Sequence, residues 1–153
     1  MKFENMFSPI QIGPVEVKNR FVVPPMGNNF ANTDGTMSDQ SVAYYGARAK
    51  GGPRKPCLYD DASIPSFKKV IDACHAEGAK VSIQLQNAGP EGNAKNAGAP
   101  IQAATAVSSA DGRDIPEEVT TEQVYALVKG YGEAARRAVE AGADAVEIHM
   151  AHG

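Results

Sequence analysis

Two segments of this chain repeat the same succession of a glycine, an apolar strand and a polar end, and this repetition limits the folds open to it. EGAKVSIQLQNAG spans residues 77–89 and AGADAVEIHMAHG spans residues 141–153. In each, a Gly-Ala pair closes an expected helix, and a further glycine follows eleven residues after the first. Helix, glycine, strand and polar loop in this order are typical of parallel βα units. Strands this apolar suit a sheet that is covered on both faces.

Three helices are expected around these strands, at residues 38–50, 64–77 and 121–141. Ser38 is a plausible N-cap for the first, and Thr120 with Gln123 forms a capping box for the third. Gly78 and Gly142 end the second and third helices. The positions expected to be buried are Val42, Tyr45 and Ala49 in the first helix, Phe67, Val70, Ile71 and Cys74 in the second, and Val124, Leu127, Val128, Tyr131, Ala135 and Ala138 in the third.

The remaining segments complete the outline of an α/β fold. Residues 7–17 predict two short extended pieces around a Gly-Pro turn, and Arg20–Val23 predicts a first core strand. Residues 79–85 and 143–149 are the strands of the repeat. Residues 51–63 hold no apolar run of strand length, and their prolines argue against a central strand. A strand that a regular α/β domain would have is therefore expected to be missing there.

The length and composition of the chain exclude some classes of function but do not identify one. A chain of 153 residues, 42% hydrophobic, is long enough for one domain, and the formal net charge of −3 offers no electrostatic footprint for nucleic acid. No apolar run reaches the length of a membrane span, and the N-terminus shows no secretory signal. Cys57 and Cys74 fit no CxxC spacing and are interpreted as free, structural thiols. These features predict a cytoplasmic location.

The expected strand ends carry the residues suited to chemistry, because parallel α/β folds bind ligands there. They supply Pro24 to Gly27, then Gln84 to Asn87, then His149 to His152. Residues 87–118 follow the second of these ends, and a loop of that length is usually functional or disordered. No carboxylate pair for glycoside cleavage, GxSxG elbow or P-loop is present. Amide and imidazole donors directed at one point suit a ring with carbonyl oxygens, or a substrate oxygen that gains negative charge.

Several of these residues have more than one interpretation. His149 and His152 could donate hydrogen bonds to an oxyanion, end a strand without function, or bind a metal, although no further ligands stand at comparable spacing. A metal-dependent hydrolase built on this pair is the corresponding alternative function. Gln84 could bind a cofactor or a core partner. Gly27 could admit a flat ligand or only make a turn. His75, near the end of a helix, is interpreted as a solvated surface residue.

The chain resembles the old yellow enzyme family, and most closely its NADH:flavin oxidoreductase and 2,4-dienoyl-CoA reductase branch. Six ordered blocks carry the resemblance across nearly the whole chain. They are LF-S-P-I-x-I-G-x-x-x-x-KNR read at Phe7–Arg20, VxPPM at Val22–Met26, YYGARAKGG at residues 44–52, LYDD at Leu58–Asp61, HAEGAKVSIQLQ at residues 75–86 and GADAVEIHMAHG at residues 142–153.

The resemblance implies that residues 1–153 are the N-terminal portion of an FMN-binding (β/α)8 TIM barrel. It implies that FMN is held by Pro25, Met26, Gly27 and Gln84, and that His149 and His152 bind the electron-withdrawing oxygen of the substrate. It further implies that NAD(P)H reduces the flavin and that the substrate is a small molecule with an activated C=C bond, such as an enone, enoate or enoyl thioester. Neither nucleic acid nor a membrane is an expected partner.

The chain also departs from the pattern of the family. The second strand of the family, expected after Gly52, is missing, and Asn87-Ala88-Gly89-Pro90 stands where the family usually has His-Ala-Gly-Arg. The resemblance extends over less than half of the barrel of the family. An alternative interpretation is therefore a truncated, non-catalytic half-barrel that self-associates, because open strand edges and exposed apolar faces favour association.

Overall fold

The computed structural model of this protein describes residues 4–25, 30–47, 58–109 and 114–151. The chain divides into two compact units. The first unit holds residues 1–83 and 133–146, and the second holds residues 84–132 and 147–153. The predicted α/β composition is confirmed, and each unit is described by itself below.

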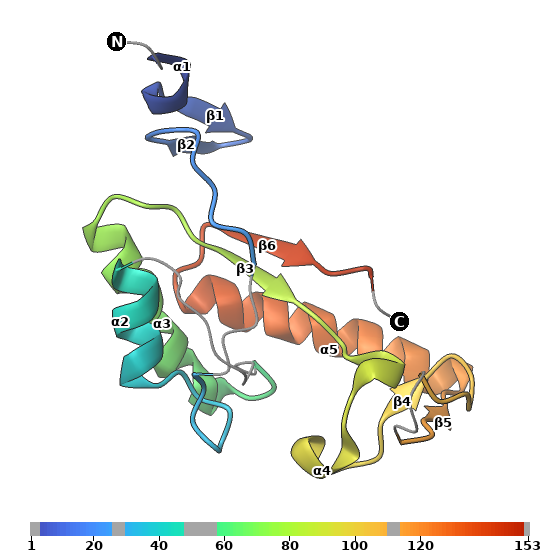
Figure 1. Ribbon diagram of the computed structural model, residues 1–153. Coiled ribbons are helices and arrows are strands. Elements are labelled where there is room, and N and C mark those ends of the chain that lie inside the picture. Colours follow the sequence, from blue (N-terminus) through green and yellow to red (C-terminus); the bar gives the residue numbers. More distant parts are fainter. Residues whose placement is uncertain (1–3, 26–29, 48–57, 110–113, 152–153) are drawn as a thin grey trace. The chain divides into compact units, whose positions relative to one another are not determined.

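The helices and strands follow one another in the order shown in Figure 1. They are α1 (Glu4–Phe7), β1 (Ile10–Ile12), β2 (Val15–Val17), α2 (Asp39–Ala47), the 3-10 helix η1 (Asp61–Ser63), α3 (Ile64–Ala76), β3 (Ser82–Leu85), the 3-10 helix η2 (Gly89–Glu91), α4 (Ala94–Ala97), β4 (Gln102–Ala103), β5 (Glu117–Glu118), α5 (Thr121–Glu140) and β6 (Ala145–Ile148).

The N-terminal segment of the first unit forms the expected hairpin. Strands β1 and β2 pair antiparallel, with Ile10 opposite Val17 and Ile12 opposite Val15. Gly13, in the turn between them, has a φ of 56°, a conformation that glycine adopts without steric cost. The two extended pieces predicted around the Gly-Pro turn are thus confirmed.

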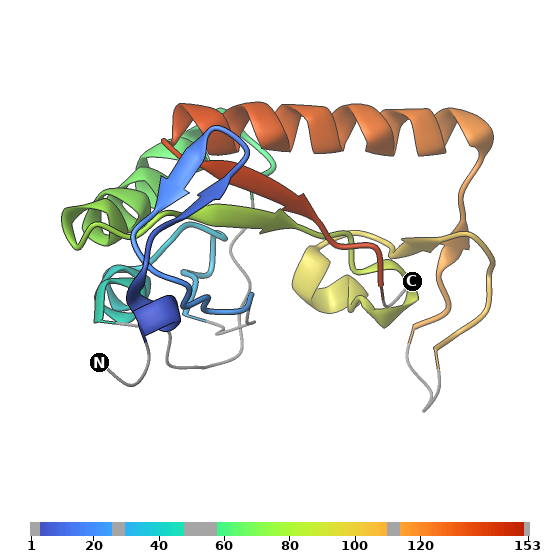
Figure 2. The ribbon, with the colours of Figure 1, turned by 90° about the horizontal axis from the view of Figure 1, so that it is seen from above.

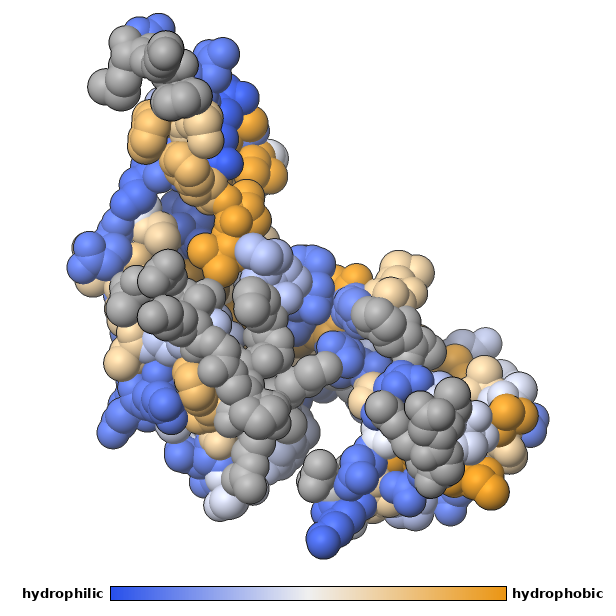
Figure 3. Space-filling view, in the orientation of Figure 1, coloured by the Kyte–Doolittle hydropathy of each residue, from blue (hydrophilic) through white to orange (hydrophobic). Residues whose placement is uncertain are grey.

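The predicted core strand at Arg20–Val23 is wrong. Residues 21–25 have no regular secondary structure, and Phe21, Val22 and Val23 are exposed, Val22 by 83%. A strand is stabilised by hydrogen bonds to a neighbouring strand, and no strand in the described part of the chain pairs with this segment. Figure 3 shows apolar side chains gathered along the N-terminal segment, where the rings of Phe7 and Phe21 lie 5.3 Å apart.

Helices α2 and α3 pack against each other and carry much of the core of the first unit. Ser38 caps α2 as predicted, since its hydroxyl oxygen accepts a hydrogen bond from the Ser41 N–H at 3.1 Å. The buried positions of α2 are Ser41 and Tyr44, whereas Val42 and Tyr45 are only half-buried. The predicted face of α2 is therefore displaced by one residue, because Tyr44 stacks edge-on against both Phe30 and Tyr45.

Helix α3 matches its prediction closely. Phe67, Val70 and Ile71 are buried, and Ile71 is only 1% exposed. Cys74 is half-buried at the end of the same stripe, and burial raises the pKa of its thiol. Gly78 follows the helix with a φ of 71°, and its N–H bonds the carbonyl of His75 at 2.8 Å. The periodicity and the terminal glycine were sufficient to locate this helix. Cys57 lies outside the described residues.

Helix α5 begins with the predicted capping box. The Thr120 N–H donates to Oε1 of Gln123 at 2.7 Å, and the Gln123 N–H donates to Oγ1 of Thr120 at 3.3 Å. Its predicted buried face is only partly correct. Ala138 is fully buried, but Val124 is exposed and Val128 is 64% exposed. Both exposed positions belong to the part of α5 in the second unit, residues 121–132, whereas Ala138 belongs to the part in the first unit.

The prediction of a missing strand at residues 51–63 falls largely outside the described residues, since 48–57 are not among them. Residues 58–63, which are described, form a bend and the 3-10 helix η1. In this part of the first unit Oδ1 of Asp61 accepts hydrogen bonds from Nη2 of Arg136 at 2.6 Å and from Nε of Arg137 at 2.7 Å. Both hydrogen bonds lower the pKa of Asp61.

Candidate active site at the ends of two parallel strands

Strands β3 and β6 form the parallel pair that the repeated segments predict. The carbonyl of Val81 accepts from the N–H of Asp144 at 2.9 Å, and the carbonyl of Leu85 accepts from the N–H of His149 at 2.9 Å. Residue numbers rise along both strands from the first of these bonds to the second, so the strands run in the same direction. Figures 1 and 2 both show the two strands side by side. Their C-terminal ends therefore lie at one edge.

The N-terminal ends of the pair are held by Asp144, whose side chain is 14% exposed. One carboxylate oxygen, Oδ2, accepts from Nε2 of His75 at 2.7 Å and from the N–H of Val81 at 2.9 Å. The other, Oδ1, accepts from Nζ of Lys80 at 2.9 Å. Burial alone would raise the pKa of Asp144, but the hydrogen bonds from Lys80, Val81 and His75 outweigh it and lower the pKa to about 2.

This contact corrects the interpretation of His75. Its side chain is not simply solvated, because it joins the end of α3 to the residue before β6. The carboxylate accepts from three donors, and each donor comes from a residue that precedes a strand or ends a helix. Asp144 thereby fixes where both strands of the pair begin.

The polar face of the strand pair carries Gln84 and Glu147. Nε2 of Gln84 donates to Oε1 of Glu147 at 2.6 Å. Side chains alternate between the faces of a strand, so Leu85, which is 6% exposed, occupies the opposite, buried face. By the same alternation His149 shares the face of Glu147, two residues further along. The structure therefore brings Gln84, Glu147 and His149 to one face at one edge.

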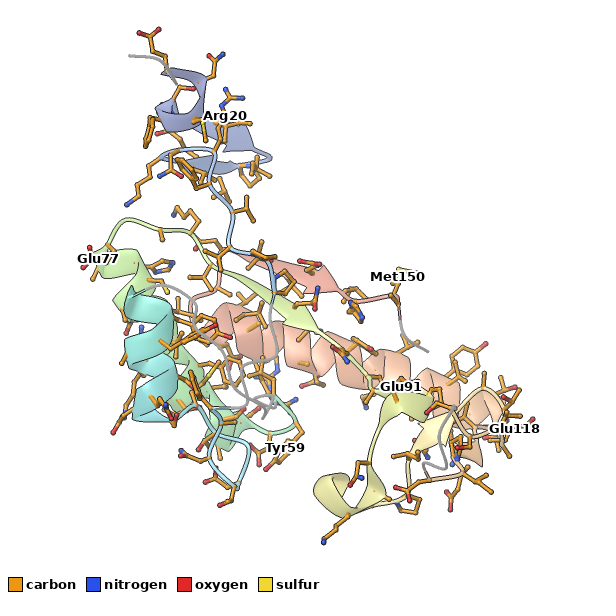
Figure 4. The ribbon with its side chains drawn as sticks, viewed as in Figure 1. Arg20, Tyr59, Glu77, Glu91, Glu118 and Met150 are labelled. Atoms are coloured by element: carbon orange, nitrogen blue, oxygen red, sulfur yellow. The ribbon has the colours of Figure 1, made fainter. Side chains whose placement is uncertain are left out.

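Of the predicted site residues, the structure describes Pro25, Gln84 and His149. Gln84 lies in β3 and His149 follows β6 directly, both in the second unit, and His149 is half-buried. Pro25 is exposed at the end of a segment of the first unit without regular secondary structure. Met26, Gly27 and His152 lie outside the described residues. Met150, labelled in Figure 4 just beyond β6, is 93% exposed.

Glu147 is one of two residues of this strand pair that the sequence did not single out. Its spacing of two from His149 within an expected strand was the available signal, since that spacing puts both residues on one face. Asp144 was missed for a different reason. Its partner His75 lies 69 residues earlier, and no local pattern reveals such a contact.

The long stretch 87–118 after β3 has a local structure of its own. Oδ1 of Asn87 accepts from the N–H of Gly89 at 2.8 Å, an Asx turn that leads into η2. Gly92 lies so close to Ile101 that an added Cβ would stand 2.8 Å from its Cγ2 atom. Strands β4 and β5 pair in parallel, with Gln102 beside Glu117. The side chain of Asn87 thus stabilises the first turn of its own loop, at the position where the family usually has histidine.

The described residues offer neither a metal site nor a membrane span. No group of three or more histidine, cysteine, aspartate or glutamate side chains is arranged to hold a metal ion there. No helix in the same ranges has the length and apolarity that crossing a membrane requires.

Comparison with known proteins gives the family context. A profile described as the NADH:flavin oxidoreductase / NADH oxidase family matches residues 5–53 and 48–153. The chain is 34% identical over 172 aligned positions to the probable NADH-dependent flavin oxidoreductase YqiG of Bacillus subtilis, covering 99% of this chain and 46% of that protein. It is 33% identical to the cinnamate reductase of Clostridium sporogenes, covering 99% of this chain and 26% of that protein.

The fold agrees with the same group. The old yellow enzyme of Pichia sp. AKU4542 superposes with a TM-score of 0.83 at 30% identity, over 97% of this chain and 46% of that structure. The structure is thus a partial α/β fold that corresponds to about half of an old yellow enzyme barrel. The alignment to the Bacillus protein is longer than the 153 residues of this chain, so that relative has residues without a counterpart here.

The two segments matched by the profile overlap at residues 48–53, beside the stretch in which a strand is predicted to be missing. The absence of that particular strand stays a prediction. The chain spans about half the length, or less, of the relatives that it matches. Matches that together cover nearly every residue nevertheless establish its ancestry: the chain belongs to the NADH:flavin oxidoreductase / NADH oxidase family, that of the old yellow enzymes.

Proposed function

We propose that this chain forms part of an FMN-dependent oxidoreductase that uses NAD(P)H to reduce activated carbon–carbon double bonds. The family uses FMN, with NADH or NADPH as the reductant. The observation that carries the proposal is the position of Gln84 and His149 at the C-terminal edge of two hydrogen-bonded parallel strands. Ligands of α/β folds bind at this edge.

The donor set at this edge fits the polar rim of an isoalloxazine ring. That rim alternates carbonyl oxygens with an N–H group, and the amide of Gln84 offers both a donor and an acceptor to it. The family resemblance assigns Pro25, Met26 and Gly27 to the loop beneath the ring. When bound, FMN supplies the hydride-transfer chemistry that no protein side chain provides.

His149 and His152 would bind the substrate. Imidazole N–H groups at this edge would donate to the carbonyl or carboxyl oxygen of the substrate and stabilise the negative charge that builds on it during reduction. The substrate class follows from this role, because only a double bond conjugated with such an oxygen delivers charge to it. Cinnamate, from which one relative takes its name, has a double bond of this kind.

The test combines binding and turnover. FMN is titrated into the wild-type chain and into Q84A and H149A, and NAD(P)H consumption is followed with cyclohexenone as the probe. Q84A is expected to weaken FMN binding about tenfold, the effect of losing one hydrogen bond of ordinary strength. H149A is expected to keep its FMN affinity and to lose about 100-fold in kcat/KM, as when one oxyanion donor is removed.

The exposed Glu118 of β5 provides a matched control, since E118A removes a carboxylate outside the proposed site. Failure of the wild-type chain to bind FMN at millimolar concentration would refute the proposal for this polypeptide. Turnover of cyclohexenone by H149A at the wild-type rate would refute the role given to His149 alone.

A further inference from the structure

We infer that Glu147 is a positioning residue, which fixes the orientation of the Gln84 amide so that this amide can hold the ring of FMN. This inference rests on the proposed function, because it takes Gln84 to be a flavin ligand. It adds a residue of β6 to the cofactor site, although Glu147 itself would touch only Gln84.

The contact itself is specific. Gln84 and Glu147 lie side by side on adjacent strands, 63 residues apart in the chain, and their side chains meet at 2.6 Å. This separation is just below the ordinary range of about 2.7–3.2 Å for N–H···O hydrogen bonds. The backbone bond from His149 to Leu85, just beyond, holds the strands in this register.

The chemistry of the two groups determines which way the amide faces. A carboxylate only accepts hydrogen bonds, so the nitrogen of Gln84 must face Glu147. The carbonyl oxygen of Gln84 and its second N–H are then directed away from the carboxylate. If the amide flipped, its oxygen would face the carboxylate, and two acceptors would be opposed without a proton between them.

The fixed orientation matters for a ring whose edge alternates acceptors with a donor. An amide presents a matching acceptor and donor only in one orientation, and a freely flipping amide spends part of its time in the wrong one. Holding a ligand in its binding orientation in advance lowers the entropic cost of association. Glu147 would therefore raise the affinity for FMN without touching it.

Three variants separate this role from a structural one. E147A removes the acceptor, E147Q keeps a hydrogen-bonding group that can donate as well as accept, and E118A controls for the loss of an exposed carboxylate. The first measurement is the 1H–15N resonance of the Gln84 side-chain amide in the flavin-free chain, and the second is the dissociation constant for FMN, followed by NMR up to millimolar concentration.

We expect E147A to move the Gln84 amide resonance to the position of an unbonded amide and to weaken FMN binding about tenfold, because the released Gln84 side chain must then be ordered when FMN binds. E147Q should weaken FMN binding by an amount between those of E147A and the wild type, because its amide can face Gln84 with either its oxygen or its nitrogen, and E118A should change neither measurement. Wild-type FMN affinity in E147A overturns the inference while leaving the proposed function intact, whatever the resonance shows. If wild-type protein shows no FMN binding, the proposed function fails and the role of Glu147 fails with it.

Discussion

Nε2 of His75 lies 2.7 Å from Oδ2 of Asp144, so a hydrogen bond between residues 69 positions apart joins the end of α3 to the start of β6. The same carboxylate also holds Lys80 and the backbone of Val81. One side chain therefore sets the beginning of both strands that lead into the candidate site.

The stability of the fold should depend on the ionisation of Asp144. Its pKa of about 2 in the folded chain lies below the ordinary value of 3.8, so its contribution is complete above pH 4 and is lost as the pH falls through 2. The contribution at pH 7 is on the order of 1–2 kcal/mol, after allowance for solvent screening. Urea unfolding at pH 7 should show that D144N has a lower free energy of unfolding than the wild type by this amount. The difference between the two should largely disappear near pH 2. A gap that stays constant over this range would contradict the assignment.

The buried stripe of α3 should dominate the stability of the first unit. Ile71 is 1% exposed, and its replacement by alanine should cost about 2–5 kcal/mol, as is usual for a fully buried isoleucine. V139A, at a position of α5 that is 64% exposed, is the matched control and should fall within about 0.5 kcal/mol of wild type. Equal losses in denaturant unfolding for both variants would show that the stripe is not the core.

The two arginines that contact Asp61 should not be equivalent. The side chain of Arg137 is 14% exposed and also donates to the carbonyl of Leu58 at 3.3 Å, whereas that of Arg136 is more exposed and pairs with Glu133 and Glu140 on its own helix. R137A should therefore lower the melting temperature more than R136A, because it leaves a backbone acceptor without this partner. High salt should reduce the effect of R136A more strongly. The reverse order of melting temperatures would show that the surface pairs matter more than the half-buried contact.

The exposed apolar segment Phe21–Val23 should drive self-association. Large apolar patches on a soluble surface commonly mark contact sites, and here three consecutive apolar residues lie in the open. Sedimentation velocity should show oligomers that increase with concentration, and the double variant V22S/V23S should shift the distribution toward monomer. The control is T105S, a conservative change at an exposed position of the second unit. Identical sedimentation of V22S/V23S and wild type would exclude this segment as the contact.

The sequence predicted most accurately those elements that are determined by residues close together in the chain. The stripe of α3, the capping box at Thr120 and Gln123, and the terminal Gly78 and Gly142 all depend on residues within a few positions of one another. The parallel pair was predictable as well, because its two segments repeat each other.

Contacts that depend on distant residues were not predictable in the same way. Val22 and Val23 have strong strand propensity, yet a strand forms only where a neighbour pairs with it. Val128 belongs to a helical stripe yet is exposed, because a stripe does not show which part of a long helix other elements cover. Glu147 and Gln84 were each visible in the sequence, and only the register of two strands shows that they bond.

The distance between Asp144 and His149 has a consequence for how this protein can change. The residue that anchors the strand and the residue proposed to meet the substrate are five positions apart, about 16 Å of extended chain. Substitutions at the first alter how firmly the chain folds, while substitutions at the second alter which molecules it handles. Folding stability and substrate specificity can therefore change independently among related sequences, because they depend on residues at opposite ends of the same short strand.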